Sequence, residues 1–305
     1  MASPVFSVII PAYNAGSYVR EAISSILAQS FTDFECIILD DGSSDDTLSL
    51  LREMEARDSR LRIISRENRG LVTTLNELIG LSRGRYLARM DADDRAHPER
   101  LARQFEYLES HPDCVALGSI VTLIDPQGRT LKPYRLPTDH EGIVGELLEG
   151  NGGALVHPVV TLRASAVSQV GGYDSTFDYA EDWDLFLRLS EVGRLANLPD
   201  TLLDYRVHQK SYNQTRNLRQ LEAYLIRVNG VRSTRGLPPL DSLQQQRAGA
   251  DRASILNLWA CWALEGRQPG TAKSLLLQSI LSRPFRRETW KLLKYSLLHP
   301  PRATL

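Results

Sequence analysis

The chain has 305 residues, of which 42% are hydrophobic and 24% are charged, a composition that excludes collagen-like, low-complexity and intrinsically disordered proteins. Its formal net charge of −1 argues against a general nucleic-acid-binding protein. The charges are unevenly placed, however, because residues 1–205 carry 19 basic and 32 acidic side chains, whereas residues 206–305 carry 17 basic and 5 acidic ones.

The first hundred residues alternate between short β-rich runs and segments with helical periodicity. Strands are predicted over residues 5–10, 36–39, 61–64 and 86–90. Between them, apolar residues recur at spacings of three and four, which predicts three amphipathic helices. Because near-continuous apolar strands that alternate with helices form βαβ units, we expect an α/β fold with a mostly parallel sheet flanked by helices.

The pattern changes after residue 110. Residues 115–124 and 130–132 predict a β-meander, residues 159–162 a further strand, and residues 181–190 a helix. The sequence then predicts helices alone, over residues 218–228, 254–264, 271–281 and 288–298. We therefore expect an all-α C-terminal extension over residues 216–305.

Polar clusters follow three of the predicted strands, at residues 11–14, 40–43 and 91–94. Ligands of parallel α/β sheets bind beyond the carboxyl ends of the strands, so we expect these clusters to converge on one site. The chain contains neither the G-x-G-x-x-G nor the G-x-x-x-x-G-K-[ST] pattern, which argues against a dinucleotide-dependent oxidoreductase and a P-loop enzyme.

The third cluster suggests a metal site. Asp91 and Asp93, separated by Ala92, place two carboxylates within reach of one hard divalent cation, whose shell substrate phosphates can complete. Taken alone, such a tripeptide is more often a solvated turn, and the same holds for residues 40–43. The interpretation therefore depends on the rest of the sequence.

Several short motifs occur in a fixed order along the chain. They are residues 7–14 (SVIIPAYN), 40–47 (DDGSSDDT), 88–94 (ARMDADD), 157–158 (HP), 170–174 (VGGYD), 180–184 (AEDWD) and 205–211 (YRVHQKS). Together they closely resemble the motifs of the family 2 glycosyltransferases, which have the Rossmann-like GT-A fold. The resemblance covers about residues 5–215. It implies a glycosyltransferase domain over residues 1–215, with a nucleotide-binding half at 1–110 and an acceptor half at 111–215.

The resemblance also implies roles for individual residues. Asp182 would be the general base, and Asp93 and His208 would contact a divalent metal ion, Mn²⁺ or Mg²⁺. The residues implied to bind the nucleotide sugar are Pro11, Ala12, Tyr13, Asn14, Asp41, Asn76, Asp91 and Ala92. Among them, Asp41 would hydrogen-bond the nucleotide base. The chain departs from many family members at Leu75, where they carry an arginine, so a phosphate contact from that position is not expected here.

The activity implied is that of a metal-dependent, inverting glycosyltransferase in polysaccharide or glycoconjugate biosynthesis. It would move a sugar from a nucleotide-diphospho-sugar, with UDP as the expected nucleotide, to a hydroxyl of a glycan or lipid-linked acceptor. A divalent cation would neutralise the charge on the leaving nucleotide. A carboxylate would take the proton of the attacking hydroxyl, and attack from the opposite face would invert the anomeric centre.

Two alternatives stay open at this point. The first is a protein that binds a nucleotide sugar without catalysis. The second is a sugar-phosphate nucleotidyltransferase, which would be expected to carry a Gly-rich, Arg-containing phosphate loop after the first strand. The loop found there, residues 11–16, contains a single glycine, Gly16, and argues against the second alternative.

The basic C-terminal segment raises the question of a membrane contact. Residues 283–302 combine six basic residues and one acidic residue with aromatic and aliphatic side chains, a pattern typical of a helix at an anionic membrane surface. The same apolar stripe would equally be explained by packing on residues 275–281. The sequence alone leaves both a membrane contact and packing on the preceding helix open for this segment.

No membrane-spanning or secretory segment is indicated. The longest apolar-rich stretch, residues 253–264, is shorter than the roughly 20 residues that span a bilayer, and residues 5–10 lack the features of a signal peptide. The three cysteines, Cys36, Cys114 and Cys261, lie too far apart to indicate a zinc site or a disulfide framework. We therefore expect a cytoplasmic protein, with the basic helix as its candidate contact at the inner face of the membrane.

Overall fold

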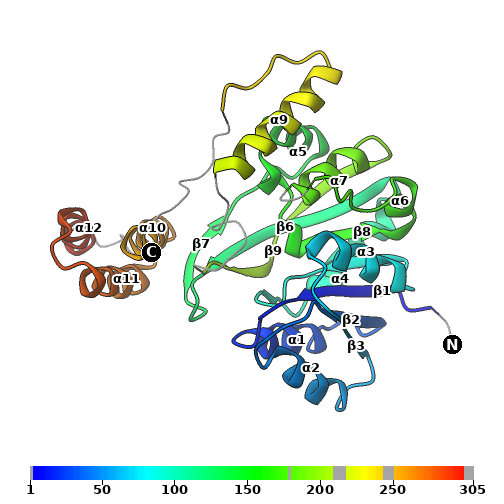
Figure 1. The fold of residues 1–305 in the computed structure, drawn as a ribbon, viewed down its shortest axis with the longest axis horizontal. Coiled ribbons are helices and arrows are strands. Elements are labelled where there is room, and N and C mark those ends of the chain that lie inside the picture. Colours follow the sequence, from blue (N-terminus) through cyan, green and yellow to red (C-terminus); the bar gives the residue numbers. More distant parts are fainter. Residues whose placement is uncertain (1–2, 178–179, 209–217, 243–250, 299–305) are drawn as a thin grey trace. The chain divides into compact units, whose positions relative to one another are not determined.

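The computed structural model describes residues 3–177, 180–208, 218–242 and 251–298. These residues confirm the predicted α/β class, because a mixed sheet is flanked by helices and the C-terminal elements are helical (Figure 1). The chain divides into two compact units. The first comprises residues 1–121, 135–204 and 224–244, and the second comprises residues 122–134, 205–223 and 245–305.

Four parallel strands form one half of the sheet, as the sequence predicts. They are β1 (Phe6–Ala12), β2 (Phe34–Asp40), β3 (Leu61–Ser65) and β4 (Tyr86–Arg89), in the order β3-β2-β1-β4. The connecting helices are α1 (Val19–Leu27), α2 (Thr47–Glu55) and α3 (Leu71–Leu81). Ala12 pairs with Asp40 in the register, so β1 and β2 end at the same level and their following loops are neighbours.

The other half of the sheet pairs through antiparallel contacts, and the sequence predicts it less well. β8 (Thr161–Arg163) lies between β4 and β6 (Cys114–Ile124), and the sheet continues through β9 (Arg194–Arg206) to β5 (Arg95–Ala96), with β7 (Thr130–Tyr134) beside β6. The strand predicted at residues 159–162 begins two residues later, because Pro158 lies in a 3₁₀ turn over His157–Val159. The sequence does not predict β9, whose apolar pattern is interrupted by Pro199.

The sequence pattern also does not predict the helix α4 (Arg100–Ser110), because the buried face of this helix is partly polar. Arg100 and Gln104 are both fully buried there. Arg100 donates to the carbonyl of Arg89 in β4 (2.6 Å), and Gln104 donates to the carbonyl of Val159 (2.8 Å). These hydrogen bonds, rather than an apolar stripe alone, fasten α4 to the sheet.

The first unit contains three further helices between residues 135 and 204: α5 (His140–Leu148), α6 (Ala164–Gln169) and α7 (Glu181–Leu189). The helix predicted at residues 181–190 is α7, whereas the sequence does not indicate α5. The start of α7 is held in the core by Trp183, which is buried and whose indole N–H donates to the carbonyl of Leu147 at the end of α5 (2.7 Å).

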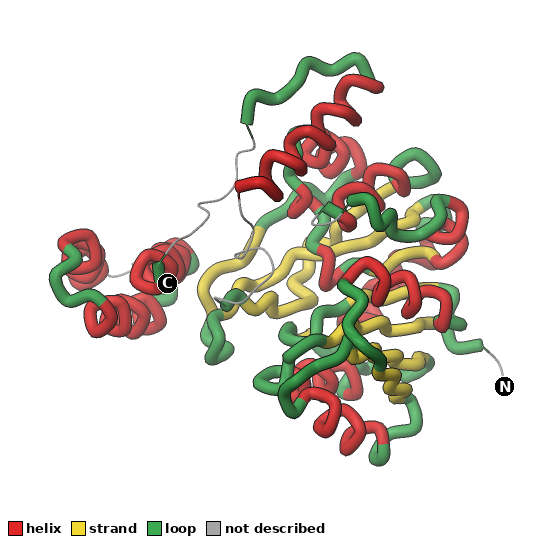
Figure 2. The backbone as a smooth tube through the Cα atoms, viewed as in Figure 1, coloured by secondary structure: helices red, strands yellow, loops and turns green. Residues whose placement is uncertain are grey.

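The C-terminal helices lie close to their predicted ranges. They are α9 (Leu218–Thr234), α10 (Arg252–Glu265), α11 (Pro269–Ser282) and α12 (Arg287–Leu298). In the second unit, α10, α11 and α12 pack on one another (Figure 2). The strand β7 belongs with them, because Lys132 forms an ion pair with Glu265 (2.7 Å). None of the helices that the structure describes has the length and apolar content needed to cross a bilayer.

Candidate active site

The loop after β1 is fastened to the loop after β2 by hydrogen bonds. The side-chain oxygen of Asn14, a residue with φ of +50°, accepts from the backbone N–H and the hydroxyl of Ser44 (2.8 and 3.2 Å). The backbone N–H of Ala15 donates to the hydroxyl of Thr47 (2.8 Å). Asn14 therefore supports the loop that follows the predicted base wall.

The three residues of that predicted wall differ in exposure. Pro11 is half-buried and Ala12 is buried, whereas the side chain of Tyr13 is 56% exposed. An exposed aromatic ring on a hydrogen-bonded loop offers a flat apolar surface to a nucleobase.

Asp41 lies buried just after β2 and ties this loop to the start of α3. Its carboxylate accepts from the backbone N–H groups of Arg69 and Gly70 (2.8 and 3.0 Å). The same carboxylate is paired with the guanidinium of Arg66, which also pairs with Glu77 of α3 (2.7 Å). Because a carboxylate has about four acceptor positions, Asp41 retains the capacity to accept one further N–H group.

Three carboxylates gather directly after β4. Asp91, Asp93 and Asp94 each offer one oxygen atom, and these three atoms lie within 4.8 Å of one another. Asp91 and Asp93 are half-buried and Asp94 is buried, so solvent reaches two of the three. Carboxylate oxygens are the ligands that Mg²⁺ and Mn²⁺ prefer, with water or substrate phosphates at the remaining positions. The donor set therefore fits the divalent cation that the sequence predicts.

Arg89, a charged residue in the buried strand β4, lies beside this cluster. Its side chain is 3% exposed, and its Nη2 lies 2.7 Å from Oδ1 of Asp91. Burial raises the pKa of Asp91 above its ordinary value, the charges of Asp93 and Asp182 act in the same direction, and Arg89 opposes them. The predicted base, Asp182, is thus close enough to Asp91 for their charges to interact.

Asp182 lies in the first turn of α7 and is half-buried. Its carboxylate accepts from the backbone N–H of Trp183 (2.8 Å). The neighbouring acid Asp184 is buried and forms an ion pair with Arg188 within the same helix. Asp182 therefore combines solvent access with proximity to the acidic cluster, whereas Asp184 stabilises the helix.

The side-chain amide of Asn76 forms two hydrogen bonds with the backbone of another residue of the protein. It donates to the backbone carbonyl of Tyr173 (2.8 Å) and accepts from the backbone N–H of the same residue (2.9 Å). The hydroxyl of Tyr173 in turn lies 2.6 Å from Nε2 of His157. Burial lowers the pKa of His157 well below its ordinary value, and the charge of Arg89 adds to this effect. Contact between Asn76 and a nucleotide sugar stays a prediction.

Two predicted site residues remain to be placed. Ala92 is buried between the two aspartates of the cluster. His208 follows β9, is half-buried and belongs to the second unit, and its predicted metal contact stays a prediction.

Sequence reasoning missed Arg89, Arg66 and the pair formed by His157 and Tyr173. A signal was present for Arg89, because a charged residue inside a buried strand needs a partner, and Asp91 follows two positions later. His157 and Tyr173 lie in motifs that carried the family resemblance, but nothing in the sequence showed that they contact each other.

Comparison with known proteins shows which family and which fold the chain resembles. The model of glycosyl transferase family 2 matches residues 7–166. An uncharacterized glycosyltransferase of Haemophilus influenzae is 35% identical, over 72% of this chain and 70% of its own length. The O-antigen biosynthesis glycosyltransferase WbnJ of Escherichia coli is 31% identical, over 68% of this chain and 81% of its own length.

Two solved structures share the fold. TarS of S. aureus in complex with UDP-GlcNAc has a TM-score of 0.57 at 16% identity, over 96% of this chain and 79% of that one. The mannosyltransferase PcManGT of Pyrobaculum calidifontis, in complex with GDP-Man and Mn²⁺, has a TM-score of 0.58 at 17% identity, over 98% of this chain and 88% of that one. These likenesses confirm the expected GT-A fold.

Proposed function

Because this chain belongs to glycosyl transferase family 2 and is therefore a glycosyltransferase, we propose that it transfers a sugar from a UDP-sugar to a saccharide hydroxyl, with inversion and with the help of a divalent cation. The observation that carries the proposal is the grouping of Asp91, Asp93 and Asp94 after β4, with Asp182 near enough to influence Asp91 electrostatically. A donor-phosphate site and a base for the acceptor can both be built from these residues.

Asp91 and Asp93 would hold the cation, Mn²⁺ or Mg²⁺, with the donor phosphates. When bound there, the cation supplies positive charge that stabilises the leaving nucleoside diphosphate. Arg89 keeps Asp91 in place and offsets part of the repulsion among the carboxylates. The binding of manganese by the structurally similar PcManGT supports this assignment.

Asp182 would act on the acceptor. As the acceptor oxygen bonds to the anomeric carbon, the bond from that carbon to the diphosphate breaks, and Asp182 takes the hydroxyl proton. Attack from the face opposite the leaving group gives inversion. The first turn of α7 suits this task because Trp183 anchors the helix in the core, while Asp182 itself remains half-buried.

The nucleotide would lie against the loops after β1 and β2. Tyr13 offers an exposed ring, and Asp41 offers an acceptor for the N–H of a uracil base. UDP as the nucleotide is supported by the complex of TarS with UDP-GlcNAc. A role in polysaccharide biosynthesis is supported by the O-antigen glycosyltransferase among the relatives.

Thermal unfolding with a panel of nucleotide sugars tests the donor class. We expect UDP-sugars with Mn²⁺ to raise the Tm, because a ligand that binds the folded state alone stabilises it. GDP- and ADP-sugars at the same concentration serve as controls. A rise in Tm with GDP-sugars alone would reject UDP as the nucleotide. An equal rise in Tm with and without Mn²⁺ would reject a role for the cation in donor binding. Release of UDP in the presence of saccharide acceptors would then separate turnover from binding alone.

A further inference from the structure

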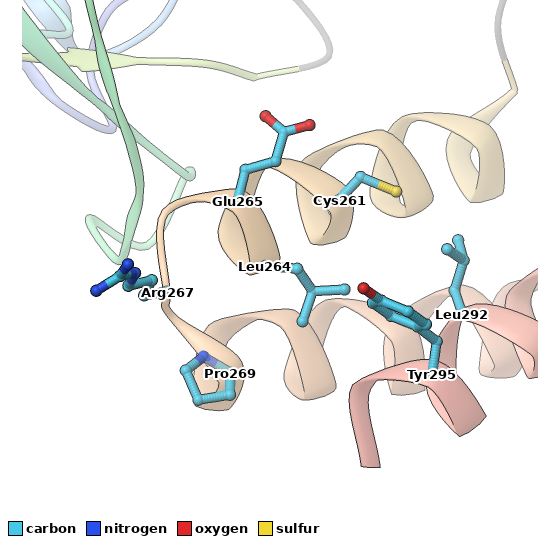
Figure 3. Close-up of a pocket in the computed structure, with 7 residues that line it drawn as sticks. All are labelled: Cys261, Leu264, Glu265, Arg267, Pro269, Leu292 and Tyr295. Carbon is cyan, nitrogen blue, oxygen red and sulfur yellow. The ribbon is translucent and has the colours of Figure 1, made fainter. Parts of the chain in front are cut away.

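The helix α12 has two fully buried small polar side chains, and three of its large apolar ones, Trp290, Tyr295 and Leu297, are exposed. Thr289 and Ser296 are fully buried, and the hydroxyl of Thr289 accepts a hydrogen bond from the side-chain amide of Asn257 on α10 (3.0 Å). Leu292 and Tyr295 border a pocket of about 320 Å³ that α10 and α11 also line (Figure 3). These contacts fix which side of α12 faces its neighbouring helices.

The consequence is an exposed apolar face. Trp290 and Leu297, seven residues apart and so on one side of the helix, are 50% and 59% exposed. Phe285, in the connection from α11 to α12, is 94% exposed. The helices α11 and α12 are in contact, and Leu292 and Leu293 are half-buried, whereas Trp290 and Leu297 leave half or more of their surface exposed.

Basic side chains lie next to this face. Arg287, Lys291 and Lys294 follow one another at spacings of four and three, which places them on one side of α12, adjacent to Trp290. All three are exposed, and within the described part of the chain none of them forms an ion pair. Arg283 and Arg286, by contrast, are paired with Asp251.

We propose that this surface, formed by Phe285, Arg287, Trp290, Lys291, Lys294 and Leu297, docks on an anionic phospholipid bilayer. Charge complementarity selects the occupant, because the described residues 251–298 carry eight basic and three acidic side chains. A helix with basic residues beside exposed tryptophan and leucine lies in the plane of the headgroups, with its apolar side chains inserted below them. The proposal stands independently of the proposed activity, since it concerns no residue of the acidic site.

Co-sedimentation of the full chain with vesicles tests it. We expect binding to vesicles of phosphatidylcholine and phosphatidylglycerol in equal parts, and much weaker binding to phosphatidylcholine alone. About 1 M salt should reduce the binding strongly, because the Debye length falls to about 3 Å. Replacing Arg287, Lys291 and Lys294 together by Gln should weaken the partitioning about 100-fold, since each basic residue contributes about fivefold.

Matched variants locate the contact. Replacing Arg57, Arg62 and Arg103 by Gln removes the same net charge from exposed positions of the first unit and should leave binding unchanged. Phe285→Ser should weaken binding, whereas Ile226→Ser, at an exposed apolar position of α9, should not. Equal and negligible pelleting of the wild type with both vesicle types would reject the proposal. The proposal would also be rejected if the wild type did not bind vesicles but associated with itself, and if Phe285→Ser abolished that association. The surface would then bind a second copy of the chain.

Discussion

The guanidinium of Arg89 lies 2.7 Å from the carboxylate of Asp91, and this ion pair joins the buried sheet to the acidic cluster. Arg89 is almost completely buried, and its Nε and Nη1 have no hydrogen-bond partner among the described residues. Burying a cation in this way is costly unless a nearby negative charge compensates it. The compensation comes from Asp91, and in return Arg89 fixes the orientation of that carboxylate.

The first prediction concerns this pair. Arg89→Met should weaken Mn²⁺-dependent UDP binding at least tenfold, because Asp91 loses the partner that orients it and the carboxylates then repel one another without compensation. Arg89→Lys keeps the positive charge and should restore part of the affinity. Calorimetric titration with UDP and Mn²⁺ measures both effects. Wild-type affinity in Arg89→Met, with a lowered Tm, would limit Arg89 to a role in stability.

The second prediction concerns the metal. Asp93→Ala should abolish the Mn²⁺-dependent part of UDP binding and leave the Tm without ligand nearly unchanged, because Asp93 is half-buried and close to other negative charges. Asp113→Ala, at an exposed position before β6, is the matched control and should bind UDP like the wild type. Undiminished manganese-dependent binding in Asp93→Ala would remove this residue from the metal site.

The third prediction separates two acids of one helix. Asp182→Asn keeps the shape of the side chain and loses the base, so turnover should fall by about 10²–10⁴-fold with donor affinity nearly unchanged. Asp184→Asn breaks the ion pair with Arg188 and should lower the Tm instead. Sugar transfer and thermal unfolding of both variants provide the comparison. Wild-type turnover in Asp182→Asn would place the base elsewhere.

The parallel half of the fold could be predicted because β1, β2 and β4 are buried on both faces and read as near-continuous apolar runs, while its helices are amphipathic. The acidic cluster could be predicted for a related reason, since Asp91 lies two residues after the end of β4. The helix α4 could not, because its buried face includes Arg100 and Gln104, which are satisfied by carbonyl groups distant in sequence. The spacing of hydrophobic residues in a sequence gives no information about hydrogen bonds from buried polar side chains to distant carbonyl groups.

In the candidate site, too, some features could be predicted from the sequence and others could not. Tyr13, Asp41 and Asp182 could be named from motifs, which specify residue types and order along the chain. The partners that hold them, such as Arg66 for Asp41, lie on other elements and become known only when the chain is folded. The motifs therefore predicted candidate residues for the chemistry, and the tertiary structure was needed to show which side chains hold those candidates in place.

The fourth prediction concerns acid stability. The carboxylate of Glu35 on β2 accepts from the hydroxyl of Ser7 (2.7 Å) and from the backbone and guanidinium of Arg83 (2.9 and 2.7 Å). Burial acts to raise the pKa of Glu35, but the hydrogen bonds from Arg83 and Ser7 outweigh it, and the pKa lies below its ordinary value. A carboxylate whose pKa is lower in the folded than in the unfolded state stabilises the folded protein at pH values above its unfolded-state pKa, about 4.3. This stabilisation is lost as the pH falls through the folded-state pKa.

Glu35→Gln should therefore lower the Tm at pH 7 by about 2–4 °C and lower it less, relative to the wild type, as the pH falls below about 4. Thermal unfolding of both proteins between pH 3 and 7, with pH steps fine enough to resolve the acid limb, measures the difference. A Tm difference that stays constant across this range would show that ionisation of Glu35 does not contribute.

The last prediction decides between two roles for Asn76. The family resemblance implies contact with the nucleotide sugar, whereas the structure gives both polar atoms of its amide to the backbone of Tyr173. Tyr173 is buried, so Asn76→Ala would leave its N–H and carbonyl without these partners, at a cost of about 1–3 kcal/mol for each group left unsatisfied. We expect the Tm to fall by several degrees.

Asn76→Asp refines this test, because a carboxylate still accepts from the N–H of Tyr173 but no longer donates to its carbonyl. The Tm of this variant should lie between those of the wild type and Asn76→Ala. A residue whose main role is ligand contact would behave differently: the KM for the donor would rise in both variants while the Tm without ligand stayed at the wild-type value. A raised KM with an unchanged Tm would support contact between Asn76 and the nucleotide sugar. A lowered Tm in the order given above would identify Asn76 as the residue that positions Tyr173 and, through Tyr173, His157.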